Sequence, residues 1–573
     1  MFLYLFCDKI YLMKKKNIFN NFSQKNRKFV LGGHTLTFLG VLFLLVLPQI
    51  TQLFIDSVYS SSGTKEANFG VLWGLLTNGQ VLDLGQIVLW LSISFVLVAI
   101  LKNVCTFFAS QCYFLGASRS RSALRRACFK KLSFLDNSVS IKQTFFNFTS
   151  DVTDFADIFY RHRPKMFDAG AKIVVASLLC FLIDKQIALG FLILVPVMFL
   201  VGFALERKLV EKYSEARNRK SIMFGSSEDL IENIKEIKTF GAEDWAIEKY
   251  NAFNKAHTTT ITDAGSLVQK HKFWLGVIRG LGIFMAAALS AFACFKGLIS
   301  VGYFVLFITY AVIIFDACSA FMTSFYDCKV ASISAKRLGK FLDTPTKIQD
   351  NLAPLPPKFD IELKNVGLVS SGQEVFKNLN LNIKFGTHIA LLMGDNQGKT
   401  SLARMLLKFL PNTSGEILFA GNPQDIYSIS SLRKGFSYVP QEPAIFEGTI
   451  ADNITMFAKI DDKKLAKVIK VCGLEELVNS YKHKENHFLV ESGKNLPSQI
   501  RQKIMFARAL YRDAPVLLID SAFNKFDITE AEELLEIILK AYKGKTVIYL
   551  SEEPLLAQKL KKVVRIENGS EKE

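Results

Sequence analysis

A short segment near residue 400 combines two glycines, a lysine and two hydroxyl side chains, which together could bind phosphate. It follows an apolar run at 389–393 and precedes a segment that we expect to be helical. Backbone N–H groups at a helix N-terminus wrap an anion, the lysine would reach the β and γ phosphates of a nucleotide, and the first hydroxyl would hold Mg²⁺. The candidate nucleotide-binding residues are Gly394, Asn396, Gln397, Gly398, Lys399, Thr400 and Ser401.

This phosphate loop departs from the usual spacing, which places a glycine five residues before the Gly-Lys pair. Met393 occupies that position and Gly394 follows one residue late, while Asn396 stands where another glycine is usual and tolerates a positive φ. A second chemical group, Asp520, ends the apolar run 516–520 and is placed to hold Mg²⁺ through water. An aspartate at a strand end can also be a simple cap. Because Asp520 occurs together with a phosphate loop in the same domain, the interpretation as a metal ligand is favoured.

The residues that surround these groups predict an α/β domain with a parallel sheet. After Pro354, Pro356 and Pro357, short apolar segments alternate with helical ones. Continuous apolar runs indicate strands that are buried on both faces, and they occur at 389–393, 516–520 and 546–550. We therefore expect an α/β P-loop nucleotide-binding domain over residues 346–573.

The first part of the chain has a different composition. Long apolar runs crowd its first 325 residues and are absent afterwards. A membrane helix needs about 20 mostly apolar residues. The expected spans are 29–55, 85–109, 167–183, 187–204, 273–295 and 300–323. The prediction is an all-α six-helix transmembrane domain over residues 1–345, whose helices continue into the cytoplasm over 110–166 and 205–272.

The charge distribution gives the expected orientation. The net charge is +18, which is compatible with nucleic acid or with an anionic membrane surface as partner. Basic residues flank the apolar spans and are frequent before residue 29 and after residue 110. In the loop 56–84, by contrast, Lys65 is the only basic residue. Because positive loops stay inside, we predict a multi-pass protein of the cell membrane with both termini and the nucleotide-binding domain in the cytoplasm, and no nucleic-acid binding.

Three further expectations concern isolated features. Arg279 and Asp316 lie at similar depth in the last two spans, so they could form an ion pair or line a cavity, or their helices could already project into water there. The cysteines show no metal-ligand spacing and no disulfide framework. The N-terminal apolar run is short and broken by Asp8 and Lys9, so we expect no cleaved signal peptide; Met13 is an alternative start.

With these motifs in this order, the chain resembles an exporter-type half-transporter of the ABC transporter superfamily. The resemblance covers nearly the whole chain. Besides the phosphate loop and Asp520, the resemblance rests on these segments: Glu228–Glu243, Thr413–Ile417, Tyr438–Gln441, Phe446–Ile450, Asp452–Ile454 and Ala507–Leu510. It implies that ATP and Mg²⁺ are the cofactors, that Gln441 senses Mg²⁺ and the attacking water, that Asp527 contacts a second subunit, and that the protein acts as a homodimer or as a heterodimer with a second half-transporter.

The departures from the family pattern fall on its catalytic groups. Ser370 stands where an aromatic residue stacks on adenine, and Leu496–Ile500 lacks both glycines of the signature, although Ser498 could still offer its hydroxyl to nucleotide. Ser521 replaces the glutamate that polarises water, and Glu552 replaces the switch histidine, where a carboxylate would repel the γ-phosphate. The resemblance therefore leaves ATP hydrolysis uncertain.

Two hypotheses of function follow. In the first, the chain is a transporter subunit that couples ATP binding and hydrolysis to the export of an unidentified substrate across the membrane. In the second, it is a non-hydrolysing nucleotide-binding membrane subunit with a regulatory or structural role. The replaced residues favour slow or absent hydrolysis, whereas the architecture favours transport.

Overall fold

The structure is a computed structural model that describes residues 26–61, 84–132, 150–344, 352–370, 372–394, 397–490, 493, 496–567 and 570–572. These residues fall into two compact units that meet in the sequence between Pro345 and Thr346. Asn396, one of the candidate site residues, and Asp8, Lys9 and Met13 lie outside the described residues.

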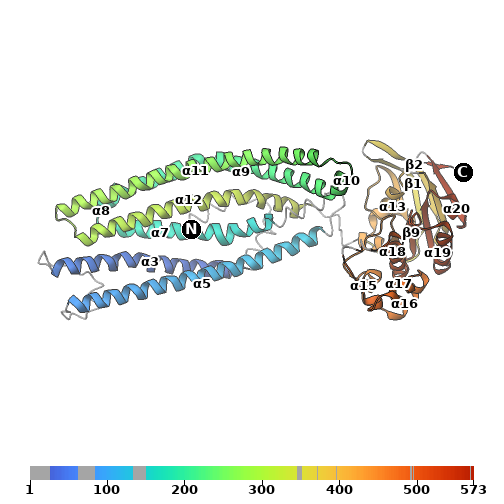
Figure 1. Cartoon of the computed structure of the whole chain (residues 1–573), viewed down its shortest axis with the longest axis horizontal. Coiled ribbons are helices and arrows are strands. Elements are labelled where there is room, and N and C mark those ends of the chain that lie inside the picture. The colour runs from blue at the N-terminus through green and yellow to red at the C-terminus, as the bar shows by residue number, and fades with distance from the viewer. Residues whose placement is uncertain are drawn as a thin grey trace. The chain divides into compact units, whose positions relative to one another are not determined.

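The first unit is helical and confirms the six expected spans, since six described helices are long and apolar enough to cross a membrane. Figure 1 shows them running nearly parallel to one another. Their bounds are α3 Arg27–Ser61, α5 Leu84–Leu132, η1 Ile158–His162 with α7 Arg163–Ile183, α8 Lys185–Leu192 with α9 Leu194–Glu232, α11 Glu243–Phe295 and α12 Val301–Asp343.

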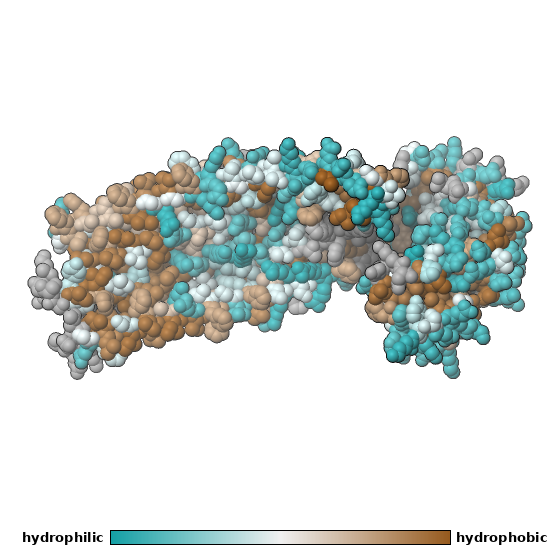
Figure 2. Space-filling model, in the orientation of Figure 1, coloured by the Kyte–Doolittle hydropathy of each residue, from teal (hydrophilic) through white to brown (hydrophobic). Residues whose placement is uncertain are grey.

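These helices are much longer than a bilayer requires. Helix α5 continues to Leu132, and α11 begins at Glu243, far before its apolar part. The apolar surface gathers at one end of the unit and gives way to polar side chains along the rest of it (Figure 2). The described parts of 110–166 and 205–272 therefore continue the membrane helices, as the sequence predicts. The segment Glu228–Glu243 is not one helix: it holds the end of α9, the short α10 (Ile234–Thr239) and a turn.

Ion pairs hold the polar extensions of these helices together. Asp154 accepts hydrogen bonds from Arg217 of α9 at 2.6 Å and from Ser334 of α12 at 2.8 Å. Asp151 pairs with Arg337 of α12 at 2.7 Å. Each carboxylate therefore joins helices that are distant in sequence, beside a buried apolar cluster that includes Val152, Phe155 and Leu338.

Arg279 of α11 and Asp316 of α12 form an ion pair, with Nε to Oδ1 at 2.8 Å. This contact agrees with the first of the alternatives that the sequence left open. Both side chains are about half exposed in the single chain, at 44% and 49%. Since a charge inside a membrane is costly unless it is paired, each residue lowers the cost of burying the other.

The described residues of the second unit form three sheets, and Figure 1 labels strands β1, β2 and β9 among them. A six-stranded sheet has the order β12-β11-β3-β10-β9-β6, a four-stranded antiparallel sheet has the order β2-β1-β4-β5, and β7 pairs with β8. The strands are β1 Ile361–Ser370, β2 Gln373–Ile383, β3 His388–Met393, β4 Ser414–Phe419, β5 Asn422–Pro423, β6 Phe436–Val439, β7 Gly448–Thr449, β8 Phe488–Leu489, β9 Val516–Asp520, β10 Thr546–Ser551, β11 Lys562–Glu567 and β12 Ser570–Lys572.

Helices surround these sheets. They are α13 Lys399–Leu406, α14 Ile429–Lys434, α15 Ile450–Thr455, α16 Asp462–Val471, α17 Glu475–Ser480, α18 Ser498–Arg512, α19 Ile528–Ala541 and α20 Pro554–Ala557, with 3₁₀ turns η2 Gln424–Ile426 and η3 Lys484–Asn486. The α/β prediction is confirmed, because β3, β10 and β9 are adjacent parallel strands that contain the three apolar runs. The four-stranded antiparallel sheet was not part of the prediction.

Candidate nucleotide-binding site

The phosphate loop lies between strand β3 and helix α13. Met393 is the last residue of β3 and is buried in the core, so the loop begins at Gly394. This arrangement accounts for the methionine at the usual glycine position, because its side chain packs inside the sheet unit rather than lining the loop. The backbone N–H of Gly394 donates a hydrogen bond to Oε1 of Gln397 at 2.8 Å, which closes the described part of the loop.

Gly398 sets the end of the loop and the start of the helix. Its φ is +91°, in the left-handed region, and it is the N-cap of α13. A Cβ at this position would lie 2.4 Å from Cγ1 of Val375 and 2.8 Å from Cζ of Phe376. Only glycine therefore fits, and the backbone after it turns directly into the helix whose first residues are Lys399 and Thr400.

The side chain of Lys399 contacts a carboxylate. Its Nζ donates to Oε2 of Glu552 at 2.8 Å, and the lysine side chain is only 11% exposed. Asn524 donates to the other carboxylate oxygen of Glu552 at 2.9 Å. The structure thus brings together the lysine expected to bind phosphate and the glutamate that replaces the switch histidine. A nucleotide phosphate and this carboxylate would compete for the same ammonium group.

Asp520 provides the features expected of a metal ligand. It ends β9 and is 1% exposed, and its Oδ2 accepts a hydrogen bond from the Tyr438 hydroxyl at 3.0 Å. Its Oδ1 is buried and has no hydrogen-bond partner among the described residues. Burial raises the pKa of Asp520, and the nearby Thr400 hydroxyl and Lys399 charge oppose the rise. A buried carboxylate oxygen beside a threonine hydroxyl fits a hard cation such as Mg²⁺.

The remaining candidates are less closely connected. Ser521 follows Asp520 with a φ of +47°, is 2% exposed, and has a hydroxyl without a hydrogen-bond partner in the described part of the chain. Gln441 follows β6 in an exposed loop, and Ser498 is the exposed first residue of α18. Within the described ranges, the hydrogen bonds of Asp520 do not include Gln441 or Ser498. Ser401 follows Thr400 in the first turn of α13.

Two residues of the site were absent from the sequence-based set. Asn524 fixes the Glu552 carboxylate, and the Tyr438 hydroxyl fixes that of Asp520. Tyr438 belongs to the segment Tyr438–Gln441, which was noted only because it matches the family pattern. Its position on β6, the strand beside β9, could have indicated its contact with Asp520. Asn524 had no comparable signal, because its role depends on how a loop places it.

A P-loop unit joined to a six-helix membrane unit is the arrangement of a membrane transporter driven by nucleotide, and comparisons with known proteins agree. Residues 31–318 match the family model of the ABC transporter transmembrane region, and residues 376–524 match that of the ABC transporter. The chain therefore belongs to the ABC transporter family.

The chain is also similar in sequence to known relatives and in fold to a solved structure. An export ATP-binding/permease protein of Rickettsia bellii is 24% identical over 517 residues, covering 87% of this chain and 88% of the relative. An ATP-dependent lipid A-core flippase of Pseudoalteromonas translucida is 25% identical over 498 residues, covering 83% and 84%. The structure of a bacterial Atm1-family ABC exporter with ATP bound is similar in fold, with a TM-score of 0.79, 17% identity and coverage of 96% and 94%.

Proposed function

We propose that this chain is one half of a dimeric ABC exporter that binds ATP and Mg²⁺ but hydrolyses ATP slowly. The phosphates would be bound at the loop that ends in Lys399, and Mg²⁺ would be held by Thr400, Asp520 and Gln441. Bound Mg²⁺ would neutralise phosphate charge, and the chain's own residues would orient the nucleotide. The partner subunit is a second copy or a second half-transporter.

The observation that carries this proposal is the contact between Lys399 and Glu552 at 2.8 Å. In an exporter that turns over quickly, the lysine must be available to stabilise phosphate charge. Here a carboxylate already neutralises that ammonium, and Asn524 holds the carboxylate in place. Nucleotide must therefore displace Glu552 before it can use the lysine, and the displaced negative charge stays near the γ-phosphate.

Two other positions support slow hydrolysis. Ser521 cannot accept a proton from water as a glutamate would, and a positioned acid–base group typically contributes about 10²–10⁴-fold to a rate. Ser498 lies at the start of α18 behind Pro497, which has no N–H to offer an anion. In an exporter dimer each ATP site combines one subunit's phosphate loop with the other's signature, so this chain would weaken both sites.

The expected orientation completes the proposal. The basic residues that flank the spans favour a cytoplasmic position for the termini and for the nucleotide-binding domain, in the cell membrane. The relatives are named for export and for flipping of lipid A-core. These names favour an amphipathic cargo that reaches the protein from the bilayer.

The test is to measure ATP binding and ATP hydrolysis by the purified full chain in lipid nanodiscs, alone and with candidate partner subunits. We expect Mg²⁺-dependent binding that Lys399→Ala removes, and turnover by the chain alone well below about 1 s⁻¹, the low end of typical enzyme rates. Faster turnover by the chain alone that is lost in Lys399→Ala would overturn the proposal of slow ATP hydrolysis. Unchanged binding in Lys399→Ala would refute the assignment of the phosphate loop.

A further inference from the structure

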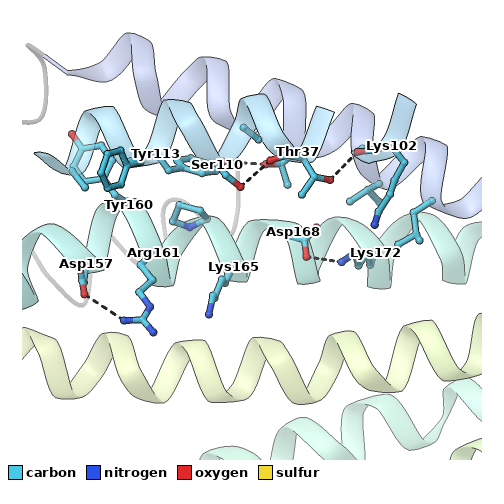
Figure 3. Close-up of a pocket in the computed structure, with 18 of the residues that line it drawn as sticks. Thr37, Lys102, Ser110, Tyr113, Asp157, Tyr160, Arg161, Lys165, Asp168 and Lys172 are labelled. Carbon is cyan, nitrogen blue, oxygen red and sulfur yellow. Dashed lines mark hydrogen bonds and ion pairs between the residues drawn. The ribbon is translucent and has the colours of Figure 1, made fainter. Parts of the chain in front are cut away.

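A cavity of about 520 Å³ lies inside the helical unit, between helices α3 and α5 on one side and η1 with the first half of α7 on the other. It belongs entirely to this unit and is separate from the nucleotide site. Figure 3 shows polar and charged side chains from all three helices around it. Its size is within the usual range for small-molecule sites, and nothing described so far uses it.

Positive charge is in excess in this cavity. Its lining has two carboxylates, Asp157 and Asp168, and five basic side chains, which are Lys102, Arg121, Arg161, Lys165 and Lys172. Asp157 lies 2.5 Å from Arg121, and Asp168 lies 2.6 Å from Lys172. Neither Lys102 nor Lys165 has an acidic partner among the described residues.

The cavity wall also has an apolar part. Val41, Leu44, Phe114 and Pro164 line it together with the rings of Tyr113 and Tyr160. In Figure 3 the two tyrosines lie at one end, and the Lys102 ammonium points from α5 toward α7, where Lys172 lies beside Asp168. A ligand there would meet aromatic and aliphatic surface together with ammonium groups.

The position of the cavity along the helices matches the boundary of the bilayer. Lys102 lies within the expected second span, near its end at residue 109, and Lys172 lies near the start of the third, at residue 167. Asp157 and Arg161 lie on the polar continuation of that third helix. On the proposed orientation this is the level of the cytoplasmic leaflet, where lipid head groups meet acyl chains.

We infer that this cavity is a binding site for an amphiphile with an anionic head group, of the phospholipid type. Lys102 and Lys165, which have no carboxylate partner among the described residues, bind the head group together with Lys172, and the anion replaces the Asn103 amide oxygen that the Lys102 ammonium contacts at 3.3 Å. The wall around Val41, Leu44 and Phe114 receives the start of the acyl chain. Asp168 and Asp157 limit the affinity, since Asp168 pairs with Lys172, and Asp157 with both Arg121 and Arg161, until the anion binds. The idea that this amphiphile is the exported cargo rests on the proposed export function. The binding of the amphiphile in this cavity does not depend on that function.

The experiment measures binding of tail-labelled phosphatidylglycerol to the purified full chain in neutral detergent without nucleotide, by fluorescence anisotropy. Tail-labelled phosphatidylcholine with the same acyl chains tests the need for net negative charge. Unlabelled inorganic phosphate tests whether the head group alone suffices. The variants are Lys102→Gln/Lys165→Gln and Asp168→Asn, and the matched control is Lys185→Gln, an exposed lysine at the opposite end of the spans.

We expect phosphatidylglycerol to bind at least about tenfold more tightly than phosphatidylcholine, because the choline ammonium cancels the phosphate charge of phosphatidylcholine and is repelled by the excess of basic side chains in the lining. The double lysine variant should lose about tenfold or more in affinity, Asp168→Asn should gain affinity, and Lys185→Gln should match the wild type. Equal binding of both lipids, no loss in the double variant, or an equal loss in the control would overturn the site. Displacement by millimolar phosphate would overturn the amphiphile in favour of a free anion. Because no nucleotide is present, slow or fast ATP hydrolysis does not affect these outcomes.

Discussion

Lys399 and Glu552 are 153 residues apart in the sequence, yet their charged groups lie 2.8 Å apart. They meet because β3 and β10 are adjacent parallel strands, and each residue follows shortly after the carboxyl end of its strand. The pair places an internal anion at the group that a P-loop uses for phosphate. On the proposed function, Glu552 would therefore compete with nucleotide phosphate for Lys399.

Restoring both catalytic positions should increase ATP hydrolysis. The double variant Ser521→Glu/Glu552→His provides a base for water and removes the carboxylate at Lys399, so turnover in nanodiscs should rise by about 10²-fold or more. Ser521→Ala keeps the site without a base and should leave the low rate unchanged. A double variant as slow as the wild type would show that other positions limit hydrolysis.

The conformation of Gly398 can be tested in the same assay. Gly398→Ala forces a side chain into the left-handed region and against Val375, so nucleotide affinity should fall by at least about tenfold, since such strain costs about 1–3 kcal/mol. Gly421→Ala is a suitable control, because it has a φ of +77° but nothing within 4 Å of the added Cβ. If the two variants bind ATP equally well, the clash at Gly398 does not shape the loop.

Asp520 should make stability depend on pH. Burial raises its pKa above the usual 3.8, so the folded chain binds this proton more tightly than the unfolded chain, and the charged form is destabilising above the folded pKa. Asp520→Asn should therefore raise the unfolding temperature of the nucleotide-free chain at pH 7 by about 2–4 °C. That advantage should shrink as the pH falls through the folded pKa. An advantage that stays constant with pH would contradict a charged, buried Asp520.

The ion pair between Arg279 and Asp316, in the expected last two spans, predicts a charge-reversal rescue. Asp316→Asn leaves Arg279 without its partner, which costs about 2–3 kcal/mol in the membrane, and the yield of folded protein should fall. The reversed pair Arg279→Asp/Asp316→Arg should recover most of that yield. The control Asp263→Asn changes an exposed carboxylate on the polar part of α11 and should have no effect. Failure of the reversed pair to exceed Asp316→Asn would argue against the pairing.

The sequence predicted the features that depend on apolar length and on strand-end position. The six spans and strands β3, β9 and β10 were found because a long apolar run indicates a membrane helix, and a short one indicates a strand that is buried on both faces. Strands β1 and β2 were missed because their buried and exposed residues alternate irregularly, with register shifts between Leu363 and Val369. The basic cavity could not be predicted either, since its lining joins helices that are distant in sequence.

The site itself was only partly predictable. Lys399 and Asp520 were found from the loop motif and the end of an apolar run. Ser521 and Glu552 were found only through the resemblance to the family, which indicated that the Glu552 carboxylate would repel phosphate. Its contact with Lys399 depends on side-chain conformations and on Asn524, which donates to Glu552 from a separate loop. Pattern and spacing contain no information about such contacts.

The most direct test of the account is the ATP affinity of Glu552→Gln, measured by calorimetry with Mg²⁺ on the full chain in nanodiscs. Glu553→Gln is the matched control, because it removes the same charge from the neighbouring residue, whose side chain caps α20 instead. Since the Glu552 side chain is partly exposed, the pair is partly screened. If Glu552 competes with phosphate, ATP should bind about three- to tenfold more tightly to Glu552→Gln, with no gain in Glu553→Gln. Unchanged or weaker binding in Glu552→Gln would contradict the claim that this carboxylate competes with phosphate for Lys399.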